Sequence, residues 1–173
     1  MKKHLSFHSL SLPLTPFLFL LLFAACSSKS DIVIDEQRTF ANDVWNRVTP
    51  EVFEVDIADE GDYFHIDLTV AVDTALYRYK EFPFNLDIYT PDGTHRHLTP
   101  QFDVKNHDRW KGEADGRYRV VTKRVQNYFY FNTPGKHRIE VQQATSQYNL
   151  EGIHAFKLHI EKAELDIDKL KEN

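Results

Sequence analysis

The stretch "YFHIDLTVAV", residues 63–72, decides the fold class. Apolar side chains occupy every second position from Phe64 to Val72, and residues such as His65 and Asp67 fill the positions between them. Successive side chains of a β-strand point to opposite faces of the sheet. The alternation therefore predicts a strand with one buried face and one face toward solvent.

The same alternation recurs along the chain, in "VFEVDI" (52–57), "FPFNLDIY" (82–89), "HRIEVQQ" (137–143) and "FKLHIEK" (156–162). Pro91-Asp92-Gly93 and the segment 132–135 carry turn residues, and both are interpreted as hairpin connections. Several short strands with one apolar face each predict an all-β protein, an antiparallel β-sandwich of the immunoglobulin-like or jelly-roll-like kind. The irregular stretch 102–119 is expected to be a long loop.

The N-terminal segment predicts a lipoprotein signal peptide. Lys2 and Lys3 precede an apolar run over 16–25, and a run of about ten residues fits a signal peptide better than the roughly 20 residues of a membrane-spanning helix. Cys26 is the only cysteine, so an intrachain disulfide is excluded. Phe23-Ala24-Ala25-Cys26 resembles a bacterial lipobox, in which the cysteine sulfur accepts a diacylglyceryl group. An ordinary secreted protein and a signal anchor remain alternatives.

The expected organisation has four parts: a signal peptide over 1–25, an acylated Cys26 with a short tether over 26–35, a β-sandwich domain over 36–162 and a charged tail over 163–173. Ser27 follows the cysteine where lipoproteins kept in the inner membrane often have Asp, which favours the outer membrane. Whether the domain faces the periplasm or the cell surface stays open.

Charge argues against a nucleic-acid partner. The chain has a formal net charge of −5. Without residues 1–25, which hold two lysines and no acids, 19 basic and 26 acidic residues remain, a net charge of −7. Phosphate binding needs a basic face, so we expect no nucleic acid among the partners.

Several segments together resemble a known family. They are the lipobox, "TFANDVWNRVTPEVFEVDI" (39–57), "YFHIDLTVAVDTALYRYKEFPFNLDIYTPDG" (63–93), "RWKGE" (109–113) and "FNTPGKHRIEVQQATSQYNLEGIHAFKLHIEK" (131–162). The pattern resembles the gliding motility lipoproteins of the GldH type. The end of the chain is the most telling part, where Leu150-Glu151-Gly152-Ile153 precedes the last strand. The region 112–131 departs from the aspartate-rich version expected in that family.

The resemblance implies a lipid-anchored outer-membrane protein of the cell envelope, associated with gliding motility and with its linked secretion machinery. Its expected partners are the membrane, through the lipid anchor, and envelope proteins of that apparatus. The family supplies no catalytic residues to carry over. The sequence also contains no nucleophile elbow, phosphate loop or zinc-protease helix. We therefore expect no enzyme activity and no cofactor.

A membrane-tethered carbohydrate- or peptide-binding module is the alternative function. In "VQNYFYFN" (125–132), alternation places Tyr128 and Tyr130 on an outward face, where tyrosine rings can form a platform. Aromatic side chains that could extend it are Tyr77, Tyr79 and Trp110. His95 and His97 share one side of an expected strand and are weak candidates for metal ligands, because spacing brings together only two of the three or four ligands a site needs. No metal is expected.

Overall fold

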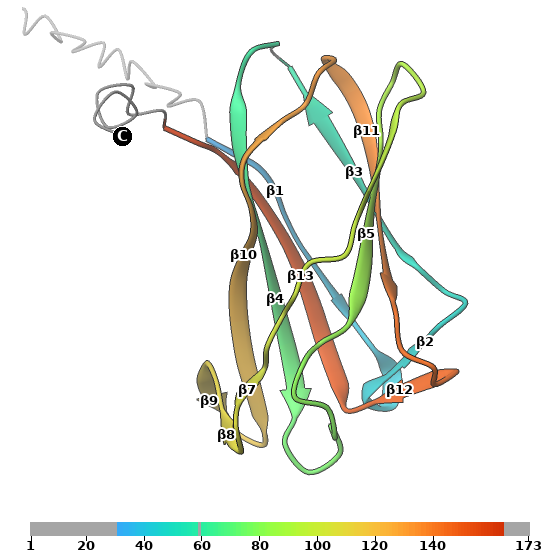
Figure 1. Ribbon diagram of the computed structural model, residues 1–173, viewed down its shortest axis with the longest axis vertical. Helices are drawn as coiled ribbons and strands as arrows, with labels where there is room; N and C mark the ends of the chain where they lie inside the picture. Colours follow the sequence, from blue (N-terminus) through green and yellow to red (C-terminus); the bar gives the residue numbers. More distant parts are fainter. Residues whose placement is uncertain (1–30, 59, 165–173) are drawn as a thin grey trace, which may run out of the picture.

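The computed structural model describes residues 31–58 and 60–164, and these residues form two packed antiparallel sheets (Figure 1). The five-stranded sheet has the order β1 (Ile32–Thr39), β13 (Ile153–Lys162), β4 (Tyr63–Asp73), β10 (Tyr118–Tyr130) and β9 (Glu113–Asp115). The four-stranded sheet has the order β3 (Glu51–Ile57), β11 (Gly135–Gln143), β5 (Phe84–Tyr89) and β6 (His95–Leu98). The predicted β-sandwich is confirmed.

The strand order is that of a jelly roll. In sequence order the long strands change sheet repeatedly, so that β1, β4, β10 and β13 form one sheet and β3, β5, β6 and β11 the other. The order β1-β13-β4-β10 facing β3-β11-β5-β6 is the double Greek key of that fold. The structure thus selects the jelly-roll-like alternative over the immunoglobulin-like one.

Short elements complete the described chain. A 3-10 turn, η1 (Ala41–Asp43), leads into β2 (Val44–Asn46), which pairs with β12 (Asn149–Glu151). A small hairpin of β7 (Lys105–Asn106) and β8 (Arg109–Trp110) lies within the stretch expected to be a loop. No helix among the described residues is long and apolar enough to cross a membrane.

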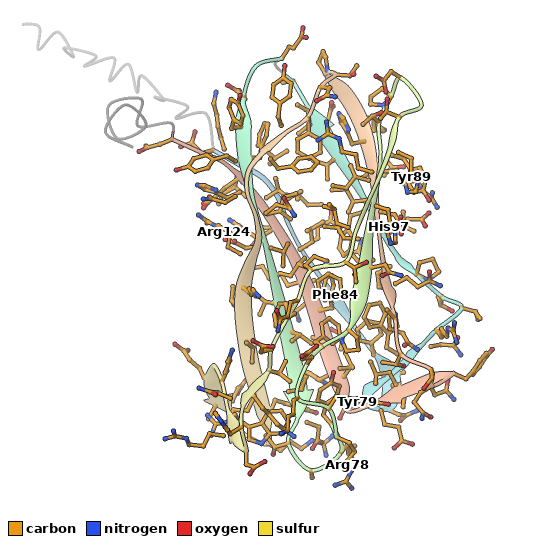
Figure 2. All side chains as sticks on the ribbon, in the orientation of Figure 1. Arg78, Tyr79, Phe84, Tyr89, His97 and Arg124 are labelled. Atoms are coloured by element: carbon orange, nitrogen blue, oxygen red, sulfur yellow. The ribbon has the colours of Figure 1, made fainter. Side chains whose placement is uncertain are left out.

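The alternating residues of β4 fill the core as predicted, since Phe64, Ile66, Leu68, Val70 and Val72 are all buried. Phe156 packs between the sheets, with its ring centroid 6.2 Å from that of Phe53 and 6.4 Å from that of Phe84. Figure 2 shows Phe84 between the sheets, with Arg124 and His97 on opposite flanks. Full burial of one such side chain stabilises the fold by about 1.5–3 kcal/mol. Trp45 is 1% exposed and stacks on Phe82.

An arginine links the two sheets on each side of the sandwich. Arg38 of β1 donates a hydrogen bond of 3.1 Å to a backbone carbonyl of β3, and its guanidinium lies 4.4 Å from the Phe53 ring centroid. Arg96 of β6 donates a hydrogen bond of 3.1 Å to the Tyr130 carbonyl of β10. Each arginine therefore satisfies backbone at a sheet edge and covers the apolar core behind it.

Three expectations need correction. The stretch 102–119 is not one long loop, since it holds β7, β8, β9 and the first residues of β10. The turn Pro91-Asp92-Gly93 does connect the β5–β6 hairpin, but the segment 132–135 is not a hairpin. It joins β10 to β11, which belong to different sheets. The sandwich also begins at Ile32, inside the segment 26–35 that was expected to be a tether. Cys26, the signal peptide and most of the charged tail lie outside the described residues.

The sandwich has two ends (Figure 1). At the Asp31 end the chain enters at Asp31 and leaves at Ala163, and Tyr63 of β4 pairs with Tyr130 of β10. At the Gly152 end lie η1, β2, β12 and the loop after β4. These names are used below.

Candidate functional site

A charged cluster lies at the Gly152 end, where four segments meet. Asp43 is 5% exposed and Asp73 is 2% exposed. The guanidinium of Arg117 contacts both carboxylates: one Nη atom pairs with Asp43, and Nε lies 3.0 Å from Oδ2 of Asp73. Two buried carboxylates without a cation would destabilise the fold, so Arg117 is required where it lies.

Two aromatic side chains complete the coordination of Asp43. The Nδ1 atom of His154 lies 2.8 Å from Oδ1 of Asp43, and the Tyr118 hydroxyl donates to Oδ2 at 3.2 Å. The Tyr118 and His154 rings stack, with centroids 4.1 Å apart. Burial alone would raise the pKa of Asp43. The hydrogen bonds from His154, Arg117 and Tyr118 outweigh that effect and hold the pKa below its ordinary value.

Gly152 joins the backbone segments of Asp43 and Asp73 by hydrogen bonds. Its N–H donates to the Asp43 carbonyl at 2.8 Å, and its own carbonyl accepts from the Asp73 N–H at 2.8 Å. Its φ is +83°, and a Cβ atom at this position would lie 2.6 Å from the Tyr77 backbone nitrogen. Only glycine fits here, because both the left-handed backbone and the contact exclude a side chain.

The surface beside the cluster is hollowed between the loop after β4 and the β11–β12 connection. Its lining residues are Leu76, Arg78, Tyr79, Gln147, Asn149, Leu150 and Glu151. Figure 2 shows Arg78 and Tyr79 at this extremity of the molecule. Three large apolar side chains of this end are exposed: Val48 by 64%, Leu76 by 40% and Tyr148 by 59%. This end therefore exposes three large apolar side chains, of which Leu76 also lines the hollow.

The five predicted aromatic residues do not form one surface. Tyr128 and Tyr130 belong to the Asp31 end, since the Tyr130 ring lies 5.4 Å from that of Tyr63. Tyr77 and Tyr79 follow the opposite end of β4. Trp110 lies in β8, partly buried under Lys105, whose Nζ is 3.9 Å from the ring centroid.

Tyr77 is not an exposed platform residue. Its side chain is 2% exposed, and its hydroxyl donates to the Glu81 carbonyl at 2.7 Å. Burial raises the pKa of this hydroxyl. Tyr79 packs against it, with the ring centroids 5.7 Å apart. The structure therefore excludes Tyr77 from a ligand surface, while Tyr128 is 42% exposed.

His95 and His97 point to the same atom. His95 Nε2 and His97 Nδ1 each lie 2.8 Å from Oδ1 of Asp87. Burial would raise the pKa of Asp87, but hydrogen bonds from the two histidines hold it below its ordinary value. Within the described ranges, no group of three or more His, Cys, Asp or Glu is arranged to hold a metal ion.

The Asp43–His154 pair resembles the acid–base part of a catalytic triad, in which a carboxylate orients a histidine. A triad also needs a nucleophile on the other ring nitrogen. Among the described residues no serine or threonine hydroxyl is hydrogen-bonded to Nε2 of His154. Arg117 also occupies the second carboxylate oxygen of Asp43. The contacts of Asp43 and Asp73 join four chain segments.

Sequence reasoning missed this cluster because its members are remote in the chain, with Asp43 and His154 separated by 111 residues. The sequence does contain one sign of it. The Leu150-Glu151-Gly152-Ile153 segment that carries the family resemblance includes the glycine that touches Asp43, Asp73 and Tyr77.

A protein-family model described as "GldH lipoprotein" matches residues 32–160. The chain belongs to the GldH lipoprotein family. The match covers the sandwich from β1 almost to the end of β13. No curated protein matches the sequence.

GldH family membership makes the protein a lipoprotein, associated with a membrane through a lipid anchor. Two glycines in the segments that carried the resemblance have a structural role, and Gly152 is one of them. Gly112 of "RWKGE" has φ +71°, and a Cβ atom there would lie 2.1 Å from the Val120 carbonyl oxygen. Two glycines of the GldH-like segments are thus positions where backbone approaches backbone.

Proposed function

We propose that this protein is an outer-membrane lipoprotein acylated at Cys26, and that it is a non-catalytic component of the gliding motility apparatus and its linked secretion machinery. The match to the GldH lipoprotein family over residues 32–160 is the observation that carries the proposal. The acyl chains fix the position of the protein, and the sandwich presents a surface to envelope proteins.

The Gly152 end supplies that surface in this proposal. Its loops are held by the Asp43–Arg117–Asp73 cluster, so little conformational entropy is lost when a partner binds. Exposed Leu76 and Tyr148 can enter a partner's apolar pockets, and the adjacent polar hollow can accept hydrogen bonds at the rim. Tethering to a membrane raises the effective concentration of this surface for neighbouring envelope proteins.

The test of anchoring is Cys26→Ala in cells. We expect the variant to leave the membrane fraction and to lose the motility phenotype, while the purified domain keeps the unfolding transition of the wild type. Cys26 precedes β1 and the family match, both of which begin at residue 32. Full motility of an unacylated, soluble variant would contradict the proposal.

The partner surface has its own test. Leu76→Ser with Tyr148→Ser removes exposed apolar area without touching the core, and Val52→Ser, a 36% exposed residue on the outside of β3, serves as the matched control. Crosslinking of acylated protein in cells, followed by purification, should recover motility or secretion components with the wild type and the control. If the double variant recovers the same amount of these components as the wild type, the partner surface is not at the Gly152 end.

The alternative of a carbohydrate- or peptide-binding module has less support. A platform of five aromatic side chains was its basis, and these side chains lie at two ends with Tyr77 buried. Retention of the soluble domain on a glycan array, lost in Tyr128→Ala with Trp110→Ala, would favour the module instead.

A further inference from the structure

Four aromatic rings lie at the Asp31 end on the outer face of the five-stranded sheet. Tyr63 of β4 and Tyr130 of β10 have ring centroids 5.4 Å apart, and the next pair, His65 and Tyr128, has centroids 5.3 Å apart. We refer to these four residues as the tyrosine rim. Tyr128 is its most exposed member, at 42%.

The chain enters the fold beside this rim. The Asp31 carbonyl accepts a hydrogen bond of 2.7 Å from the Lys162 N–H, and the next residue, Ala163, donates its N–H to the Tyr63 carbonyl at 2.7 Å. Five residue steps separate Cys26 from Asp31. Fully extended, they span roughly 17 Å. A lipid anchor on Cys26 therefore holds Asp31 within that distance of the membrane, and Tyr63 of the rim is linked to Asp31 through Lys162 and Ala163.

We propose that the tyrosine rim lies against the membrane, with its rings among the phospholipid headgroups, so that the Gly152 end projects away from the lipid. This inference rests on the proposed acylation of Cys26. Tyrosine suits the position because its ring is apolar and its hydroxyl is polar, the combination found at membrane–water interfaces.

The charges around the rim agree with a contact at headgroup depth. Asp62 pairs with Lys162 at 2.6 Å, and Arg124 pairs with Asp67 at 2.8 Å and with Glu161 at 2.8 Å. Paired charges are cheaper to bring to a lower dielectric than isolated ones. Exposed carboxylates such as Asp31, Glu60 and Glu164 remain at this end, and they keep the rim out of the hydrocarbon region.

The backbone at Tyr128 points to the same surface. The pairing of β10 with β4 is irregular between Arg124 and Phe129, and Tyr128 has φ +55°. A large side chain in the left-handed region is strained. Strain of this kind is concentrated at functional surfaces, and here it turns an aromatic ring outward next to the anchored end.

The only cysteine gives a direct test, because acylation of Cys26 leaves an introduced cysteine as the single free thiol. The probes are nitroxide labels at Tyr128→Cys and Glu60→Cys for the Asp31 end, and at Tyr148→Cys for the Gly152 end. Acylated protein is reconstituted in vesicles of phosphatidylethanolamine and phosphatidylglycerol. Collisions of each label with a water-soluble nickel complex are then compared in detergent and in vesicles.

We expect the collision rate at positions 128 and 60 to fall at least threefold on reconstitution, and the rate at position 148 to stay the same. Vesicle-bound protein whose three labels remain equally accessible would overturn the membrane contact and leave the anchor intact. Protein that carries no acyl chains and does not float with the vesicles would overturn both.

Discussion

The two ends of the sandwich are fastened by different means. The Gly152 end is held by buried charge, with Arg117 shared between Asp43 and Asp73, and by a glycine in contact with Asp43, Asp73 and Tyr77. At the Asp31 end the strands are joined by ring contacts such as that between Tyr63 and Tyr130, and by Arg96, which links β6 to β10. We therefore expect single substitutions to destabilise the Gly152 end more than the Asp31 end.

Gly152→Ala should give the largest effect on stability. An added Cβ would meet the Tyr77 backbone at 2.6 Å, at a backbone φ of +83°. We expect the free energy of unfolding to fall by about 2–4 kcal/mol, from backbone strain and overpacking together. Chemical denaturation measures the loss.

Gly61→Ala at the other end is the matched control, because Gly61 also has a positive φ, of +96°, yet its Cβ would meet nothing within 4 Å. It should cost about 1 kcal/mol. Equal losses for the two variants would mean that the contact at Gly152 contributes nothing beyond backbone strain.

Asp43→Asn should lower the free energy of unfolding by about 1–2 kcal/mol. The substitution removes one of the two carboxylates around Arg117, but the amide can keep part of the hydrogen bonding to Tyr118 and His154. The folded-state pKa of Asp43 is lowered. Its ionic contribution is therefore present above the ordinary carboxyl range, near pH 4, and is lost as the pH falls through the folded-state pKa.

The measurement is denaturation of wild type and Asp43→Asn from pH 7 to pH 3. The difference in unfolding free energy should narrow at the acid end of the series. A difference that stays constant over the whole range would show that the charge on Asp43 is not what stabilises this end.

Arg96→Gln should lower the free energy of unfolding by about 1 kcal/mol. The substitution weakens hydrogen bonds to the Tyr130 carbonyl, at 3.1 Å, and to Asn132 Oδ1, at 2.7 Å, and removes the cation above the Phe129 ring. Thermal unfolding and amide exchange of β6 would report it. Exchange that accelerates at the Gly152 end instead would contradict the view that the two ends are fastened separately.

Tyr128→Asn should have the smallest effect on stability, between no change and a gain of about 1 kcal/mol. Asparagine tolerates the left-handed backbone better than tyrosine does, and the replaced ring is largely exposed. Denaturation measures this change. A loss above 1 kcal/mol would mean that the ring supports the fold instead of serving a surface.

The strands of the core were predictable because alternation along β4, β5 and β13 is directly readable in the sequence. β1 was not predicted, and the domain was expected to begin at residue 36, because "IVIDEQRT" is an edge strand with few buried residues and little alternation to detect. The turn at 132–135 was assigned to a hairpin because its residues specify a reversal but not the sheet that the next strand joins.

The candidate site was harder to predict than the fold. Asp43, Arg117 and His154 come from three distant segments, and only the sheet order brings them together. The burial of Tyr77 could not be predicted either, because the local sequence around a loop tyrosine does not indicate whether its side chain faces the core or solvent. By contrast, the exposure of Tyr128 was predictable from its alternation with Phe129 and Phe131, which are buried.

The pairing of β1 with β13 has a mechanical consequence. The first strand runs antiparallel to the last strand, in one register from Ile34–Ile160 to Thr39–Ala155 after a shift between Ile32 and Ile34. Ladder hydrogen bonds lie perpendicular to such strands. Tension between the membrane and a load at the far end would act along β1 and stretch these bonds simultaneously, in shear. A domain loaded in that direction resists force far better than one whose terminal strand is peeled away one bond at a time.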